Sequence, residues 1–312
     1  MSIKSNLVPS EIRELFVNHD SVETRRKASE IVHSISPDID LTTVRNVYDD
    51  VMCLFSGSYP KYNPIQTPYH DLRHTLDVFI CSVRMLHGVH LSDTKLSDDE
   101  ISLIMIAALL HDVGYAQKVE ETAGTGAQFT KIHITRGIGF MEQNLGNRSI
   151  PSAWVVPLGQ IIRCTDLRVN LSDLNFASPR IKLLGQIVGS ADIVGQMADR
   201  NYLEKLLFLF TEFKEADYGN LVDTNDLLKK THSFYESIRK TLDGELGGIY
   251  QRLNFHFKDW VGDDRNYYLT SIEHNIQYLD KIIMSNESEW LSMLKRHGIV
   301  QRFKKITTES VV

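Results

Sequence analysis

The chain has 312 residues, of which 42% are hydrophobic and 24% charged, a composition that excludes wholesale disorder. The 40 acidic residues outnumber the 34 basic ones and give a net charge of −6, which disfavours an extended nucleic-acid-binding surface. The three cysteines lie far apart without a CxxC pair, so we expect neither a disulfide framework nor a zinc ribbon. The N-terminus lacks the apolar region of a signal peptide, and no apolar run reaches the roughly 18 residues of a membrane span. We therefore expect a soluble, cytoplasmic protein.

Apolar residues recur at spacings of three and four along much of the chain, whereas alternating strand patterns are scarce. The helices predicted in this way cover residues 10–17, 44–55, 72–86, 101–110 and 181–210. Residues 56–67 and 120–128 are the clearest predicted loops, and residues 217–226 form a polar break. The sequence thus predicts an all-α protein. We expect a core with N-terminal helices over residues 1–220 and a C-terminal helical extension over 221–312, packed together as one compact unit.

The first chemical motif is YHDLRH at residues 69–74, which contains two histidines four residues apart. If this segment is helical, His70 and His74 lie on one face, with Asp77 nearly in line. A pair at this spacing is also common on a solvated helix face, so the motif needs partners elsewhere in the chain.

The second motif follows the apolar run ISLIMIAALL, which ends abruptly in His111 and Asp112. A buried helix that delivers an imidazole and a carboxylate needs a compensating partner such as a metal ion. The alternative is a helix that reaches the surface at His111, where both groups meet water.

The third motif is Asp192, an acid inside an apolar helical pattern in which Gly185, Gly189 and Gly195 allow other helices to come close. A lone aspartate here could be a structural hydrogen-bonding group. A metal ion shared by His74, His111, Asp112 and Asp192 would instead explain the three motifs together, and this mixed nitrogen and oxygen set suits a transition metal.

The combined pattern H…HD…D resembles the signature of the HD-domain phosphohydrolases. Within that superfamily, YHDLRHTLDV is similar to a segment of the class I cyclic nucleotide phosphodiesterases, and the similarity extends to Thr165-Asp166 and Ala191-Asp192. It covers roughly residues 68–213. The resemblance implies an HD-domain, phosphodiesterase-like helical bundle around a metal centre.

By resemblance, His74, His111, Asp112 and Asp192 hold a first metal ion, Asp112 bridges to a second, and His70 is the general acid. The implied cofactors are two divalent ions, a transition metal such as Zn, Mn or Fe at the first site and Mg or Mn at the second. The implied reaction is hydrolysis of a phosphodiester, most simply a cyclic nucleotide, by a metal-activated water.

Two positions depart from the phosphodiesterase pattern: Asp71 stands where that family has Asn, and Tyr115 where it has a second His. Lys131 and His133 are candidates to replace that histidine by binding a phosphate or the second metal, although they could equally form an exposed first helical turn. For the purine-binding glutamine of that family the candidates are Gln196, Gln251 and Gln277, and for an acid that orients a histidine they are Asp77 and Asp166.

Other functions remain open at this point. A nucleotidase or phosphomonoesterase would use the same metals, a diiron oxygenase would use a related centre, and a metal- or nucleotide-sensing module would bind without turnover. The expected partner is a small phosphorylated substrate, and the resemblance implies that it is a nucleotide. The sequence does not decide whether the chain forms a homo-oligomer. We expect the remaining histidines at the surface or as helix caps: His19, His33, His87, His90, His232, His256, His274 and His297.

Overall fold

The computed structural model describes residues 20–92, 94–146 and 149–309, and within these ranges the protein is all-α. Pairing between extended segments in the described residues is limited to two isolated bridges, Tyr62 with Lys118 and Gly146 with Ile150. The α-helices are α2 (Ser21–Ile35), α3 (Thr42–Ser56), α4 (Leu72–Ser92), α5 (Asp98–Leu110), α6 (His133–Phe140), α7 (Ser152–Ile162), α8 (Pro179–Ala198), α9 (Tyr202–Glu215), α10 (Thr224–Asp243), α11 (Leu253–Val261), α12 (Tyr267–Ile283), α13 (Trp290–Met293) and α14 (Ile299–Glu309). The predicted all-α class is confirmed.

The predicted helices over residues 44–55, 72–86 and 101–110 correspond to α3, α4 and α5, while residues 10–17 lie outside the described residues. The single helix expected over 181–210 is wrong, because the chain breaks between α8 and α9. Asp199, at the break, accepts hydrogen bonds from the Asn201 backbone N–H at 2.9 Å and from Arg73 at 3.0 Å. The apolar spacing continues across this break because both flanking helix ends are buried, so periodicity alone could not reveal it.

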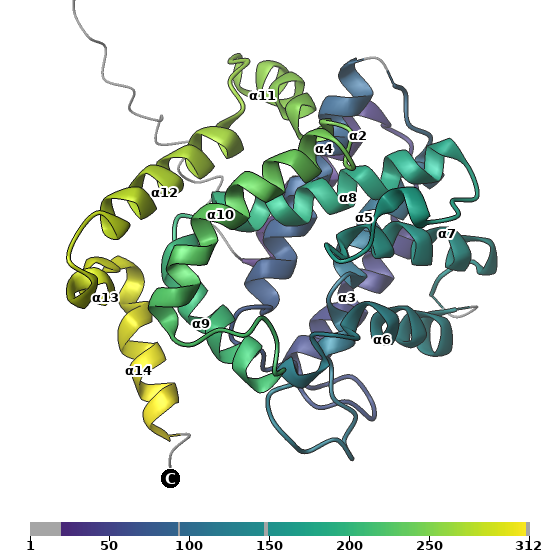
Figure 1. The fold of residues 1–312 in the computed structure, drawn as a ribbon. Coiled ribbons are helices and arrows are strands. Elements are labelled where there is room, and N and C mark those ends of the chain that lie inside the picture. The colour runs from purple at the N-terminus through teal and green to yellow at the C-terminus, as the bar shows by residue number, and fades with distance from the viewer. Residues whose placement is uncertain (1–19, 93, 147–148, 310–312) are drawn as a thin grey trace, which may run out of the picture.

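Helices α4, α5 and α8 form the centre of the molecule, and the other helices pack around them (Figure 1). Every residue from Ile101 to Leu110 in α5 is buried, as expected for a helix that is apolar on all sides. Its start is fixed by a capping box between Ser97 and Glu100, and Glu100 also pairs with Arg180 at the start of α8. These contacts fix the position of the N-terminal end of α5.

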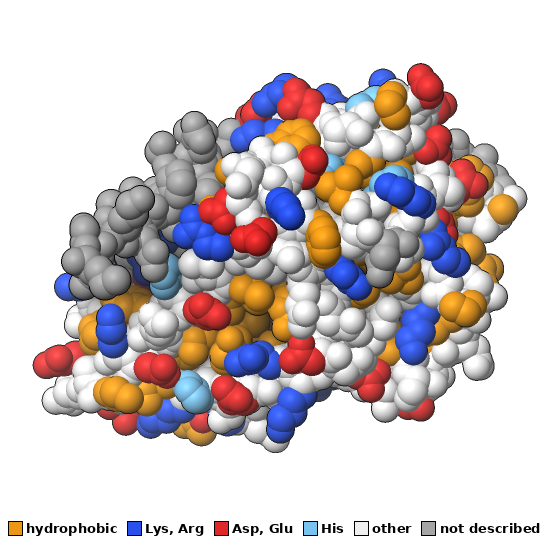
Figure 2. All heavy atoms as spheres, turned by 90° about the horizontal axis from the view of Figure 1, so that it is seen from above, with side chains coloured by type: hydrophobic (Ala, Val, Ile, Leu, Met, Phe, Trp, Pro, Cys, Tyr) orange, Lys and Arg blue, Asp and Glu red, His pale blue; other side chains and the backbone are white. Residues whose placement is uncertain are grey.

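The C-terminal helices pack on this core, with α11 against α4 and α12 against α8, and α12 to α14 lie along one side of the molecule (Figure 1). None of the described helices is long and apolar enough to cross a membrane. On the face seen in Figure 2, basic and acidic side chains are interspersed around hydrophobic ones, without a basic stripe.

Two histidines that we expected at the surface or as caps are buried: His87 is on α4 and His256 on α11. Their Nδ1 atoms lie 3.2 Å apart, and the His256 ring stacks on Trp260. Burial lowers the pKa of His87 to about 4 and that of His256 well below its usual value. At neutral pH, this pair is a neutral contact that joins the C-terminal part to the core.

Helix α8 approaches the segment around Cys164 closely enough that glycine is required at two positions. A Cβ at Gly185 would lie 2.3 Å from the Cys164 sulfur, and one at Gly189 would lie 2.4 Å from the Cys164 carbonyl oxygen. This confirms that these glycines permit close approach, here between α8 and the turn that follows α7.

We expect Gly189→Ala to lower the free energy of unfolding by about 1–3 kcal/mol, because the added methyl group meets backbone that cannot rotate away. The matched control is Gly139→Ala on α6, where a Cβ meets nothing within 4 Å; it should raise the free energy of unfolding by up to about 1 kcal/mol. Urea denaturation measures both. Equal effects in the two variants would contradict the close approach.

Candidate metal centre

Three buried side chains converge where the central helices meet and form a group that could hold a metal ion: His74, His111 and Asp112. His74 lies in the first turn of α4, while His111 and Asp112 follow the last residue of α5. His111 is 1% exposed and Asp112 4% exposed, so the alternative of a helix that surfaces at His111 is wrong. Asp192 on α8 lies slightly farther out, with Oδ1 3.4 Å from Nε2 of His74 and 3.8 Å from Nε2 of His111.

The distances between these groups suit a shared cation. Asp112 Oδ2 lies 3.2 Å from His74 Nε2 and 3.1 Å from His111 Nε2, and the two Nε2 atoms are 3.2 Å apart. Ligand atoms that bind one ion at about 2.0–2.2 Å are separated by about 3.0–3.5 Å. Asp112 Oδ2 is also buried without a hydrogen bond, which is costly unless a positive charge compensates it. The residues present therefore fit a metal ion.

The electrostatics of the group also favour a cation. Burial opposes the charged form of His74, but Asp112 and Asp192 outweigh it and raise the pKa of His74 to about 10. Burial alone would raise the pKa of Asp112, yet the nearby His111 and His70 hold that pKa well below its usual value. In the absence of a metal, protons supply the positive charge between these groups, and metal binding would displace them.

His70 lies in the same cavity, but it is not on the helix on which we expected it. It precedes α4, which starts at Leu72, so the prediction of His70 and His74 on one helix face is wrong. The chain turns into the helix at Asp71, whose Oδ1 accepts the His74 backbone N–H at 2.9 Å as an N-cap does. Both rings still meet, with centroids 5.5 Å apart.

Glu212 on α9 holds His70 in place. One of its carboxylate oxygens lies 2.5 Å from His70 Nδ1, and the other accepts the backbone N–H groups of Tyr69 at 2.6 Å and of His70 at 3.2 Å. Burial opposes the charged imidazole, but the carboxylates of Glu212 and Asp112 outweigh it and raise the pKa of His70. Our sequence interpretation missed Glu212, because an acid in an amphipathic helix gives no sign of its burial.

Three rings pack together beside the metal group. Tyr115 stacks on both His70 and His133, with ring centroids 4.7 Å and 4.6 Å away, and the centroids of His70 and His133 are 6.4 Å apart. His133 Nε2 is 3.6 Å from Asp112 Oδ1, the oxygen not shared with His74 and His111, and its Nδ1 is 2.8 Å from the Thr130 carbonyl oxygen. The structure thus places His133 on the other side of Asp112.

The other candidate residues are only partly in the cavity, which Asp166 lines and Asp77 does not. The Lys131 side chain is exposed and does not line the cavity; its backbone carbonyl accepts a hydrogen bond from Arg168. Asp77 pairs with Arg73 at 3.8 Å, and Asp166 with Arg168 at 2.8 Å. The observed partners of the ring nitrogens are instead Glu212 for His70, the Ala108 carbonyl for His111 and the Thr130 carbonyl for His133. Of the three candidate glutamines, Gln196 lines the cavity, whereas Gln251 and Gln277 are exposed.

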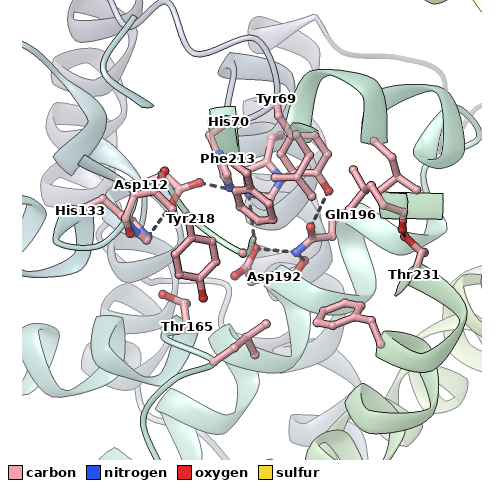
Figure 3. A pocket seen from close by; sticks show the side chains of 18 of the residues that line it. Tyr69, His70, Asp112, His133, Thr165, Asp192, Gln196, Phe213, Tyr218 and Thr231 are labelled. Carbon is pink, nitrogen blue, oxygen red and sulfur yellow. Dashed lines mark hydrogen bonds and ion pairs between the residues drawn. The ribbon is translucent and has the colours of Figure 1, made fainter. Parts of the chain in front are cut away.

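A cavity of about 460 Å³ opens onto these groups (Figure 3). In Figure 3, His70, Asp112, His133 and Asp192 surround one part of it, and Phe213 and Tyr218 lie next to them. The volume is in the range of small-molecule sites. The arrangement brings together an imidazole with a carboxylate partner and a group able to bind a cation.

A family model described as Npun_R2479-like matches residues 117–245, less than half of the chain. The matched segment includes His133, Asp192 and Glu212 but not His74, His111 or Asp112. It also crosses residue 220, where we expected the core to end. No curated protein matches the chain.

We expect Mn²⁺ or Zn²⁺ to raise the melting temperature of the metal-free protein, because an ion held by residues from α4 and α5 stabilises the folded state alone. His74→Ala should abolish this rise and the bound metal measured by elemental analysis. His70→Ala should retain both, because His70 lies outside the ligand group, and His274→Ala at the surface is the matched histidine control. Equal metal loss in His70→Ala and His74→Ala would contradict the assignment.

Proposed function

We propose that the protein is a metal-dependent phosphohydrolase. The observation that carries the proposal is the position of His70, which a buried carboxylate orients beside a metal-binding group in one cavity. A module that only binds a metal has no need for such an imidazole. The resemblance to phosphodiesterases favours a diester substrate, with a cyclic nucleotide as the substrate it implies.

Two ions would occupy the site. His74, His111, Asp112 Oδ2 and Asp192 would hold a transition metal such as Zn, Mn or Fe, while Asp112 Oδ1 and His133 would contribute to a second site for Mg or Mn. Divalent ions in such a site supply positive charge that activates a water molecule and stabilises the oxygens around phosphorus.

His70 would act as the general acid. Because Nδ1 donates to Glu212, a protonated ring has Nε2–H left to give to the departing oxygen. Glu212 keeps the ring oriented and favours its protonated form, so the acid is available near neutral pH. Tyr115 stacks on one side of the ring.

The proposal is tested with bis-p-nitrophenyl phosphate and p-nitrophenyl phosphate on protein reloaded with manganese, followed by cyclic nucleotides. We expect diester hydrolysis that is lost in His74→Ala. Turnover of the monoester alone would indicate a phosphomonoesterase or nucleotidase, and an iron-dependent visible absorption would indicate an oxygenase. Bound metal without hydrolysis of any ester would contradict the proposal and indicate a module that binds a metal or nucleotide without turnover.

Glu212→Gln tests the role of His70 through pH dependence. Loss of the carboxylate should lower the pKa of His70, so the protonated acid is lost at a lower pH and the alkaline limb of kcat/KM moves toward acid. Glu204→Gln is the matched control, because Glu204 is equally buried on the same helix and its carboxylate accepts the Arg296 backbone N–H instead. If both variants keep the limb of the parent enzyme, Glu212 does not set the protonation of His70.

A further inference from the structure

The cavity has two parts of different chemistry. The polar part contains His74, Asp112 and Asp192 together with His70 and His133. The rest is walled mainly by α9, by the segment between α9 and α10, and by α10, and the segment before α8 adds Leu167. The apolar side chains of this wall are Leu206, Leu209, Phe213, Leu221, Leu227 and Phe234. A molecule that places a phosphate at the metal group therefore extends into an apolar chamber.

Gln196 and Thr231, two polar side chains that line the cavity next to this chamber, are engaged with protein partners. Gln196 accepts the Tyr69 hydroxyl at 2.7 Å and donates to the Asp192 carbonyl at 3.1 Å, so both ends of its amide are used. Thr231 donates to the Leu227 carbonyl at 2.8 Å. Recognition of a base depends on donors and acceptors that are left to pair with it. Gln196 is poorly placed for that task.

The lysine and the arginine that line the cavity are also paired. Arg168 binds Asp166 at 2.8 Å, and Lys230 binds Asp226 at 2.9 Å. Neither side chain is therefore left unpaired to bind the additional phosphates of a substrate with a polyphosphate chain.

The apolar lining continues to the surface. Two hydrophobic residues that line the cavity are strongly exposed, Leu167 by 46% and Phe234 by 42%. They come from different walls, one from the segment before α8 and the other from α10. An apolar ligand group that extends along this lining would remove both from water.

We infer that the cavity takes a phosphate ester whose organic group is an apolar alkyl or aryl chain rather than a nucleoside. This inference rests on the proposed function for the position of the phosphate, and it replaces the nucleotide implied by the resemblance with a hydrophobic group. The metal group binds the phosphate end, and the walls of α9 and α10 bind the chain.

The test measures binding, by isothermal titration calorimetry, of alkylphosphonates from methyl to octyl to manganese-reloaded protein, with adenosine 5′-monophosphate as the nucleotide probe. Affinity should rise by about fourfold per added methylene until the chamber is filled. Octylphosphonate should bind at least about tenfold more tightly than the nucleotide. A flat series, absence of binding, or tighter binding of the nucleotide would overturn the inference.

Two variants locate the chain. Leu209→Trp should fill the chamber and weaken octylphosphonate about tenfold or more while leaving methylphosphonate nearly unchanged. Phe234→Ser, at a partly exposed position, should also weaken the long chain selectively. Met284→Ser is the control, because Met284 is 87% exposed and does not line the cavity. Circular dichroism checks the fold of each variant. The location would be contradicted if Met284→Ser lost octylphosphonate binding, or if neither Leu209→Trp nor Phe234→Ser weakened it.

The two proposals fail separately. Chain-length-dependent binding without hydrolysis of any ester would overturn the phosphohydrolase and leave the apolar chamber in place. Hydrolysis of bis-p-nitrophenyl phosphate together with an affinity that does not change along the alkyl series would support the phosphohydrolase and overturn the assignment of the chamber to an apolar chain.

Discussion

The structure depends on how the charge of Asp112 is compensated inside the protein. This carboxylate follows the fully buried α5 and has one oxygen without a hydrogen bond, so positive charge must gather around it. His74 from α4 and His111 from the end of α5 supply that charge as protonated imidazoles or share it with a metal ion. Close packing of α4, α5 and α8 is therefore a condition for the site as well as for the core.

Helix α9 connects His70, the proposed general acid, to the apolar part of the cavity. Glu212 faces His70 and the backbone of the turn before α4, whereas Leu209, one helical turn earlier, lines the apolar wall. A shift of α9 would change the orientation of His70 and the shape of the chamber together. The break at Asp199 matters for the same reason, because it allows α9 to leave the direction of α8 and cover the cavity.

The sequence predicts the parts of this protein that depend on local pattern. Apolar spacing identifies α3, α4 and α5. The three motifs together predict a metal ion shared by His74, His111, Asp112 and Asp192, and the first three of these form a buried group that could hold one. The break at Asp199 and the burial of Glu212 depend on partners distant in the chain, such as Arg73 and His70, which periodicity does not report. The buried pair of His87 and His256 was missed for the same reason, since its members are joined only by the packing of α11 on α4.

Tyr115 stands where the phosphodiesterase pattern has a histidine, and under the proposed function this difference would change which residue serves a second ion. Burial raises the pKa of Tyr115 well above its usual value, so its phenol stays protonated and is a poor ligand at neutral pH. Burial lowers the pKa of His133, which keeps that imidazole neutral and able to bind a metal. Tyr115 stacks on His133, whose Nε2 lies 3.6 Å from Asp112 Oδ1, so under the proposed function the nitrogen ligand of a second ion would come from α6.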